Sequence, residues 1–316
     1  MAVFQTYQTV GIREDLSDII YSIAPTDTPF MSGVAKEQAT NTTHEWQTDS
    51  LADVAANAAV EGADITYGTM SATTKLNNNT QISTKGIQVS GTNDAVTSAG
   101  RNSELAYQVA KAAKELKRDM ETALLSNVAK AAGNATTARK LGGLPTWIAT
   151  NVDAGSGGSG SGGGSGRTDG TQRAFTEDQL KGVLRSAFNE GGNPNMIMVD
   201  AFNKQKLSGF TGGSTRFDQA EDRRLVTSID VYESDFGTLQ VAPNRFIRGA
   251  NSTAAKKGQD AYILEMDYFA VAFLRDFSLQ NPAQTKDADQ RFMVTEYTLV
   301  SRNEKSSGMV TDLTTS

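Results

Sequence analysis

The stretch NSELAYQVAKAAKELKRDMETALLSNVAKAAGN, residues 102–134, carries the strongest helical pattern of this 316-residue chain. Its apolar side chains recur every three or four residues and form one continuous stripe, namely Leu105, Val109, Ala112, Leu116, Met120, Leu124 and Val128. Gly133-Asn134 supplies a stop signal. A helix of about 30 residues spans roughly 45 Å, so the stripe needs a partner surface of similar length.

The last part of the chain predicts that partner surface. Two long β-rich segments, residues 260–280 and 291–315, are suited to pair as strands of one sheet. In the second segment Met293, Thr295, Tyr297 and Leu299 share one face. The long helix has the only apolar stripe of matching length, so we expect it to cover this sheet.

The glycine-serine stretch GSGGSGSGGGSG, residues 155–166, lies between this helix and these strands. It is therefore not a linker between two self-sufficient halves, and its composition predicts a flexible, exposed coil. An engineered insertion is the alternative, although the flanking sequence reads as continuous. Two chance matches to G-x-G-x-x-G within it lack the preceding strand and following helix that a dinucleotide site requires.

A compact α/β pattern follows the glycine-serine stretch. Thr176 and Gln179 form a capping box at the start of an amphipathic helix. Beyond it we expect a buried strand, a second short helix and a β-hairpin that turns near residues 235–237; these are NMIMVD (195–200), AFNKQKLSGF (201–210) and IDVYESDFGTLQVAPNR (229–245). The glycine-rich loop TGGSTRFDQAEDRR (211–224) lacks the lysine of a phosphate-binding loop.

The chain before the long helix has little apolar content of its own. Residues 15–23 form one short helical candidate that ends before Pro25 and must lie on another surface. Residues 41–91 read as two β arms around a tip of small residues, and arms of about 11 to 15 residues would project about 35 to 50 Å. Because a lone two-stranded ribbon is marginal in water, we expect it to become ordered on a neighbouring subunit. The alternative is a disordered surface loop.

The composition excludes several kinds of protein. A net charge of −6 argues against a dedicated nucleic-acid binder. The chain has no cysteine and one histidine, His44, and it contains neither G-x-S-x-G nor H-E-x-x-H. No signal peptide and no membrane-spanning run is present in the sequence. We therefore predict no catalytic residue, no metal site and no cofactor, and so no enzyme.

Four segments resemble the major capsid (major head) proteins of tailed double-stranded DNA bacteriophages, which have the Hong-Kong-97-type fold. They are GIREDLSDIIYSIAPTDTPFMS (11–32), THEWQTDSL (43–51), IDVYESDFGTLQVAPNRF (229–246) and ILEMDYFAVAFLRDF (263–277). The resemblance covers essentially the whole chain and implies an α+β fold. Its parts would be an N-arm (1–40), an extended E-loop (41–91), a P domain with its spine helix (92–150), an A domain containing the glycine-serine stretch (151–254) and P-domain strands with the C-terminus (255–316).

The resemblance also implies a function. Such subunits self-assemble into pentamers and hexamers of an icosahedral head that encloses double-stranded DNA, after assembly in the bacterial host cytoplasm. Expected partners are further copies of the chain, a separate scaffolding protein, a portal, a decoration protein and DNA held by weak contacts, with no membrane. The alternatives are an encapsulin-like nanocompartment shell protein and a phage tail or adhesion protein.

One intersubunit contact can be formulated as a hypothesis. The acidic E-loop would lie across the basic face of a neighbouring spine helix, and rim charges of this kind set register and partner choice. On the loop side the residues are Glu45, Trp46, Asp49, Asp53, Glu61 and Asp64, and on the helix side they are Lys111, Lys114 and Arg118.

Overall fold

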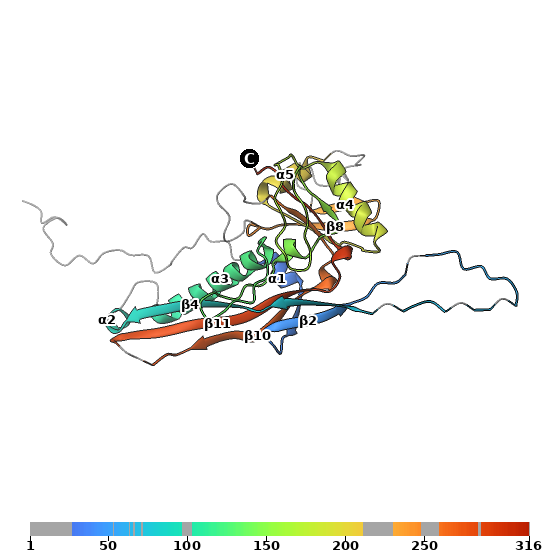
Figure 1. Cartoon of the computed structure of the whole chain (residues 1–316). Helices are drawn as coiled ribbons and strands as arrows, with labels where there is room; N and C mark the ends of the chain where they lie inside the picture. The colour runs from blue at the N-terminus through green and yellow to red at the C-terminus, as the bar shows by residue number, and fades with distance from the viewer. Residues whose placement is uncertain are drawn as a thin grey trace, which may run out of the picture.

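The computed structural model describes residues 27–52, 54–62, 64–65, 67–70, 72–96, 103–210, 230–247, 259–283 and 286–315. The chain forms a long sheet covered by one helix, a second sheet that carries two helices, and a loop that projects from one end (Figure 1). The helical candidate at residues 15–23 and the loop at 211–224 lie outside the described residues. Within the described part, none of the helices combines the length and apolarity that crossing a bilayer requires.

The long sheet has four strands in the order β1-β10-β11-β4. Their bounds are β1 Ala35–Gln38, β10 Phe269–Gln280, β11 Ala288–Ser301 and β4 Gln81–Ser90. β1 runs parallel to β10, and the other neighbours are antiparallel. α3 (Glu104–Leu125) packs on β4 and β11, which confirms that the long helix covers the paired C-terminal strands.

α3 is shorter than the predicted helix. The hydroxyl of Ser103 caps its start by accepting the N–H of Ala106, and its buried stripe is Ala112, Leu116, Met120 and Leu124. The helix ends at Leu125, so the predicted end at Gly133 is wrong. Tertiary contacts end it, because the hydroxyl of Tyr262 donates to the carbonyl of Leu125 at 3.2 Å and the chain continues extended from Ser126.

The six-stranded sheet has the order β5-β12-β9-β6-β8-β7. Its strands are β5 Val152–Asp153, β12 Gly308–Val310, β9 Ala261–Leu264, β6 Met196–Val199, β8 Gly237–Pro243 and β7 Val231–Ser234. α4 (Glu177–Asn189) begins at the predicted capping box, α5 is Ala201–Ser208, and β7 and β8 form the predicted hairpin. Short 3-10 turns lie at Leu144–Thr146, Met266–Tyr268 and Glu304–Ser306.

The expectation that residues 255–316 all complete the long sheet is wrong for β9 and β12. Both strands lie inside the six-stranded sheet. The reason is that β9 is buried on both faces, as central strands of mixed sheets are. Tyr262 packs in the core beneath α3, whereas Ile263 packs in the core that contains the buried face of α4.

α1 (Pro29–Gly33) is held to α3 by a buried carboxylate. Glu121 accepts the backbone N–H groups of Phe30 at 2.9 Å and Met31 at 2.8 Å, and the side-chain amide of Asn244 at 2.8 Å. Burial raises the pKa of Glu121, although the three hydrogen bonds oppose that shift. Because Asn244 directly follows β8, the side chain of Glu121 connects α1, α3 and the six-stranded sheet.

The glycine-serine stretch forms no helix or strand and is largely exposed, as predicted, but hydrogen bonds and close packing hold it at several points, which its composition does not predict. The N–H of Gly164 donates to the carbonyl of Thr146 at 3.0 Å, and its own carbonyl accepts the N–H of Lys130 at 2.8 Å. The N–H of Gly155 donates to the carboxylate of Asp312 at 3.1 Å. A Cβ atom on Gly155 would lie 2.1 Å from the carbonyl oxygen of Thr171, so glycine is required there by close packing.

The end of this stretch is fixed by Arg167, whose side chain is 2% exposed. Its guanidinium lies 2.7 Å from Asp260, 3.2 Å from Asp312 and 3.3 Å from Asp169. Burial raises the pKa of Asp260, although the positive charge of Arg167 acts to lower it. The cluster ties the stretch to the C-terminal segment, which is a tertiary contact that composition does not reveal.

Candidate interaction surface

The predicted long hairpin is reduced to a short root. β2 (Thr43–Thr48) pairs antiparallel with β3 (Thr74–Asn79), six residues on each side, and the rest of the returning arm is β4, which leaves the hairpin to pair with β11. Thr80 lies between the end of β3 and the start of β4, and its buried hydroxyl donates to Glu296 at 2.8 Å. The projecting part is therefore residues 49–73, called the free loop below.

The hairpin root, β2 and β3, is fastened to the body by buried polar groups. The side-chain amide of Asn78 donates to the carbonyls of Leu299 at 2.8 Å and Gly142 at 3.2 Å, and its oxygen accepts the N–H of Gly142. The ammonium of Lys130 donates to Asn77 and lies 5.5 Å from the ring centroid of Trp147. Burial lowers the pKa of Lys130. These contacts fix the direction in which the free loop leaves the body.

The free loop contains no described strand or helix and projects beyond the root (Figure 1). Its large apolar side chains are 77–103% exposed, namely Leu51, Val54, Val60, Ile65, Tyr67 and Met70. Its charged residues are all acidic, namely Asp49, Asp53, Glu61 and Asp64. Apolar side chains gathered on an exposed segment are typical of a surface that another molecule covers.

The residues predicted for the loop side divide into two groups. Glu45 and Trp46 belong to the root, where Glu45 pairs with Lys75 at 2.7 Å and the ring of Trp46 lies 5.2 Å from that of Trp147. Both side chains thus have partners in their own chain. Asp49, Glu61 and Asp64 lie in the exposed part of the free loop, and Asp53 lies outside the described residues.

The residues predicted for the helix side lie on α3, but its face is not purely basic. Lys111 is 3.9 Å from Glu115, and the guanidinium carbon of Arg118 lies 5.8 Å from the ring centroid of Phe246. Lys114 is exposed. Glu115 and Asp119 alternate with these cations, so this side of the helix carries charges of both signs.

Lys85 of β4 connects the sheet to this mixed face. Its ammonium lies 2.9 Å from Asp119 and 3.8 Å from Glu115. The hydrogen bond to Asp119 raises the pKa of Lys85. The residue therefore remains a cation at neutral pH at the side of the helix.

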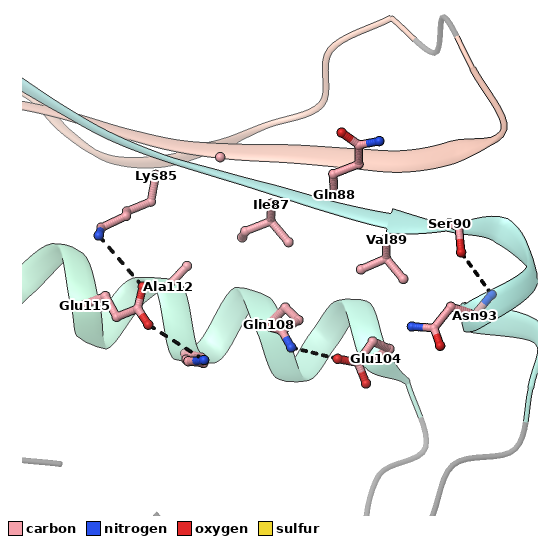
Figure 2. A pocket seen from close by; sticks show the side chains of 12 residues that line it. Lys85, Ile87, Gln88, Val89, Ser90, Asn93, Glu104, Gln108, Ala112 and Glu115 are labelled. Carbon is pink, nitrogen blue, oxygen red and sulfur yellow. Dashed lines mark hydrogen bonds and ion pairs between the residues drawn. The ribbon is translucent and has the colours of Figure 1, made fainter.

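A groove that sequence reasoning missed runs between β4 and the first half of α3. It has a volume of about 580 Å³ and is lined by Lys85, Gly86, Ile87, Gln88, Val89, Ser90, Asn93, Glu104, Gln108, Lys111, Ala112 and Glu115. Ile87 and Val89 point from the strand toward the helix (Figure 2). We call it the edge groove, because β4 is the outermost strand of its sheet among the described residues.

The described residues contain no group of three or more histidine, cysteine or acidic side chains placed to hold a metal ion. The nearest approach of His44 to a carboxylate is 3.9 Å, to Glu37.

The chain is similar to known proteins over most of its length. The model of the SU10 major capsid protein family matches residues 3–314. A curated major capsid protein of Escherichia phage Phieco32 is 41% identical over 129 residues. That alignment covers 40% of this chain and 37% of the relative, so it spans well under half of the relative's length.

Solved structures of phage and GTA particles are similar to this chain in fold. The Cyanophage A-1(L) capsid asymmetric unit matches with a TM-score of 0.67 at 13% identity, over 98% of both chains. A structure from Mycobacterium phage Bobi matches with a TM-score of 0.61 at 12% identity, over 100% of both chains. The capsid of a native GTA particle gives a TM-score of 0.62 at 11% identity, over 98% of both chains.

Proposed function

The chain belongs to the SU10 major capsid protein family and is a structural protein of a phage shell, and from this premise we propose how it builds one. Many copies close into an icosahedral head made of pentamers and hexamers around double-stranded DNA. The single observation that carries this proposal is the free loop. It presents six large apolar side chains at 77–103% exposure on a root held by buried hydrogen bonds, and no described residue of the same chain covers them.

The Hong-Kong-97-type division of the chain is part of the proposal. Residues 1–40 would be the N-arm, and residues 41–91 would be the E-loop with its root. The four-stranded sheet and α3 would form the P domain. The six-stranded sheet would form the A domain, which then includes β9 and β12 as well as the glycine-serine stretch.

Within the shell, the acidic free loop would lie on the α3 side of a neighbouring copy. Asp49, Asp53, Glu61 and Asp64 would approach Lys111, Lys114 and Arg118 there. Exposed ion pairs are each worth about 0 to 1 kcal/mol, so these charges would choose the register while buried apolar area supplies the stability. Glu45 and Trp46 would act indirectly, by stiffening the root.

Asp64→Lys and Lys114→Glu test this arrangement of charges. Each single reversal should slow shell assembly, and the double variant should recover part of the rate if the two sides meet. Arg185→Glu on the exposed side of α4 is a matched control. A double variant that assembles no better than either single variant would reject the pairing.

The other partners follow from charge and from the family. A net charge of −6 suits only weak, non-specific contact with packaged DNA. A separate scaffolding protein, a portal and a decoration protein are expected to guide assembly. An encapsulin-like compartment and a tail or adhesion protein are not favoured, because the family and the structural neighbours are phage capsids.

Electron microscopy of the purified protein tests the proposal. The full chain should form closed shells, alone or with a co-expressed scaffold. A variant in which residues 52–70 are replaced by a short glycine-serine turn should keep the circular dichroism of the folded subunit but form no shells. If that variant assembles as well as the full chain, the free loop does not carry assembly.

A further inference from the structure

The outer edge of β4 has no strand partner in the described part of the chain. Six consecutive residues of this strand, 85–90, line the edge groove together with one side of α3. Side chains of a strand alternate between the two faces, so a groove lined by consecutive residues reaches the main chain itself. The edge therefore offers N–H and C=O groups that no described strand pairs, and these are a template for a further strand.

The free loop contains a segment that suits this template. Residues 64–70, DITYGTM, combine β-branched and aromatic residues in the way that strands do. No described strand includes any of them, and Ile65, Tyr67 and Met70 are 77–96% exposed. Seven residues extend over about 23 Å, and the six residues of the groove extend over about 20 Å, so the two lengths agree.

The two elements cannot meet within one copy. The free loop projects from one end of the molecule, whereas α2 (Gly91–Ala95), which follows the grooved end of β4, lies at the other end (Figure 1). The buried contacts of Asn78 and Lys130 hold the root in its direction. A contact between loop and groove therefore joins different copies head to tail, the kind of contact that closes rings.

We propose that residues 64–70 of one copy add as a strand to the free edge of β4 in the neighbouring copy. This inference rests on the proposed shell function and names the surface that receives the loop. Main-chain hydrogen bonds would supply the pairing, and pockets for alternate side chains would set its register.

The groove has side chains that match those of the segment. Ile65 and Tyr67 share one face of a strand and would enter the groove near Ile87 and Val89, where the small side chain of Ala112 leaves room. Lys85 and Lys111 flank the groove and would face the acidic loop. Both cations already pair with carboxylates, and Glu104 and Glu115 also line the groove, so main-chain pairing and apolar packing, not charge, would carry the contact.

Proline substitution tests the main-chain pairing. Thr66 and Thr69 differ in strand parity, so the N–H of one of them must face the partner strand, and proline removes that donor. Either T66P or T69P should raise the protein concentration needed for assembly at least about fivefold. A56P and A59P, which also differ in parity and lie at the loop tip, are the matched controls and should change it less than twofold.

Disulfide trapping tests the location, because the chain has no cysteine of its own. I87C, whose side chain points into the groove (Figure 2), is combined in turn with I65C, Y67C and M70C in the full chain, and assembled shells are oxidised. At least one pair should give covalent ladders of subunits, whereas Q280C, at an exposed site of β10 outside the groove, should give none with the same loop positions.

The outcomes separate this inference from the proposed function. Shells that form normally with both threonine-to-proline variants, or that give ladders only with Q280C, overturn the strand addition while the shell function stands. Shells trapped through the groove by cysteines introduced in residues 1–26 in place of the loop would also overturn it. Failure of the wild-type chain to assemble under any condition overturns the shell function itself.

Discussion

The glycine-serine stretch and the free loop each differ from what their amino-acid composition predicts. The first contains only two residue types, yet backbone hydrogen bonds, the carboxylate of Asp312 and buried Arg167 fasten it within the chain. The second has the β-branched and aromatic residues of a strand, yet its apolar side chains are exposed. The comparison teaches that order depends on available partners, and under the proposed function those of the free loop would come from other copies.

The largest effect on folding is expected from R167M. Removing the guanidinium leaves Asp260 and Asp312 buried beside each other without a cation, which should cost about 3–5 kcal/mol of unfolding free energy. Urea denaturation of the unassembled subunit measures it. K305M, which removes an exposed ion pair with Glu190, is the control and should change stability by less than about 1 kcal/mol. Equal effects would mean that the stretch is not fastened by Arg167.

A smaller but still clear effect is expected from G155A. Its Cβ atom would lie 2.1 Å from the carbonyl oxygen of Thr171, and a backbone atom cannot move aside cheaply. We expect a loss of about 2–3 kcal/mol in denaturation experiments. G166A is the matched control within the same stretch, because its nearest neighbour would be 3.7 Å away. If both variants were equally stable, the stretch would be the flexible coil that its composition suggests.

The pH dependence of folding stability tests the contact between Asp260 and Arg167. Burial raises the pKa of Asp260, so the folded state binds this proton more tightly than the unfolded chain does. Its stabilising contribution is full below the unfolded pKa and is lost as the pH rises through the folded pKa. Melting temperatures of D260N should therefore depend less on pH than those of the wild type as the pH rises above the unfolded pKa of aspartate. An unchanged profile would contradict this origin.

Asp312 is expected to act in a different pH range. Burial alone would raise its pKa, but the N–H group of Gly170, the charge of Arg167 and the N–H group of Gly155 together lower it. Its contribution is present above the unfolded pKa and is lost only as the pH falls through the lower folded pKa. D312N should therefore lower stability most above the unfolded pKa, and its difference from the wild type should shrink as the pH falls, which urea denaturation at several pH values measures.

The smallest effect on folding is expected from polar substitutions in the free loop. Leu51, Val54 and Met70 are 96–103% exposed, so their replacement by serine should change the unfolding free energy of the subunit by less than about 0.5 kcal/mol. The same triple variant should fail to form shells in electron microscopy. A large loss of subunit stability would show that the loop has partners within its own chain.

Sequence reasoning predicted the parts of the molecule that depend on local pattern. The stripe Ala112, Leu116 and Met120 placed the long helix on the sheet, and the capping box at Thr176 placed the start of α4. The acidic character of the free loop was also readable from residues 49–64. The roles of Glu45 and Trp46 were not, because their partners, Lys75 and Trp147, are set by pairing and packing.

By itself, then, the sequence determined the long helix, the capped start of α4 and the hairpin of β7 and β8, since periodicity, capping and turn residues act over a few residues. Only the tertiary structure decided where the long helix ends, which sheet receives β9, and that the glycine-serine stretch is fixed. It also decided that β4 is the outermost described strand of its sheet and lies beside α3. The physical reason is that these features depend on contacts between residues far apart in the chain, such as Tyr262 with Leu125 and Arg167 with Asp312.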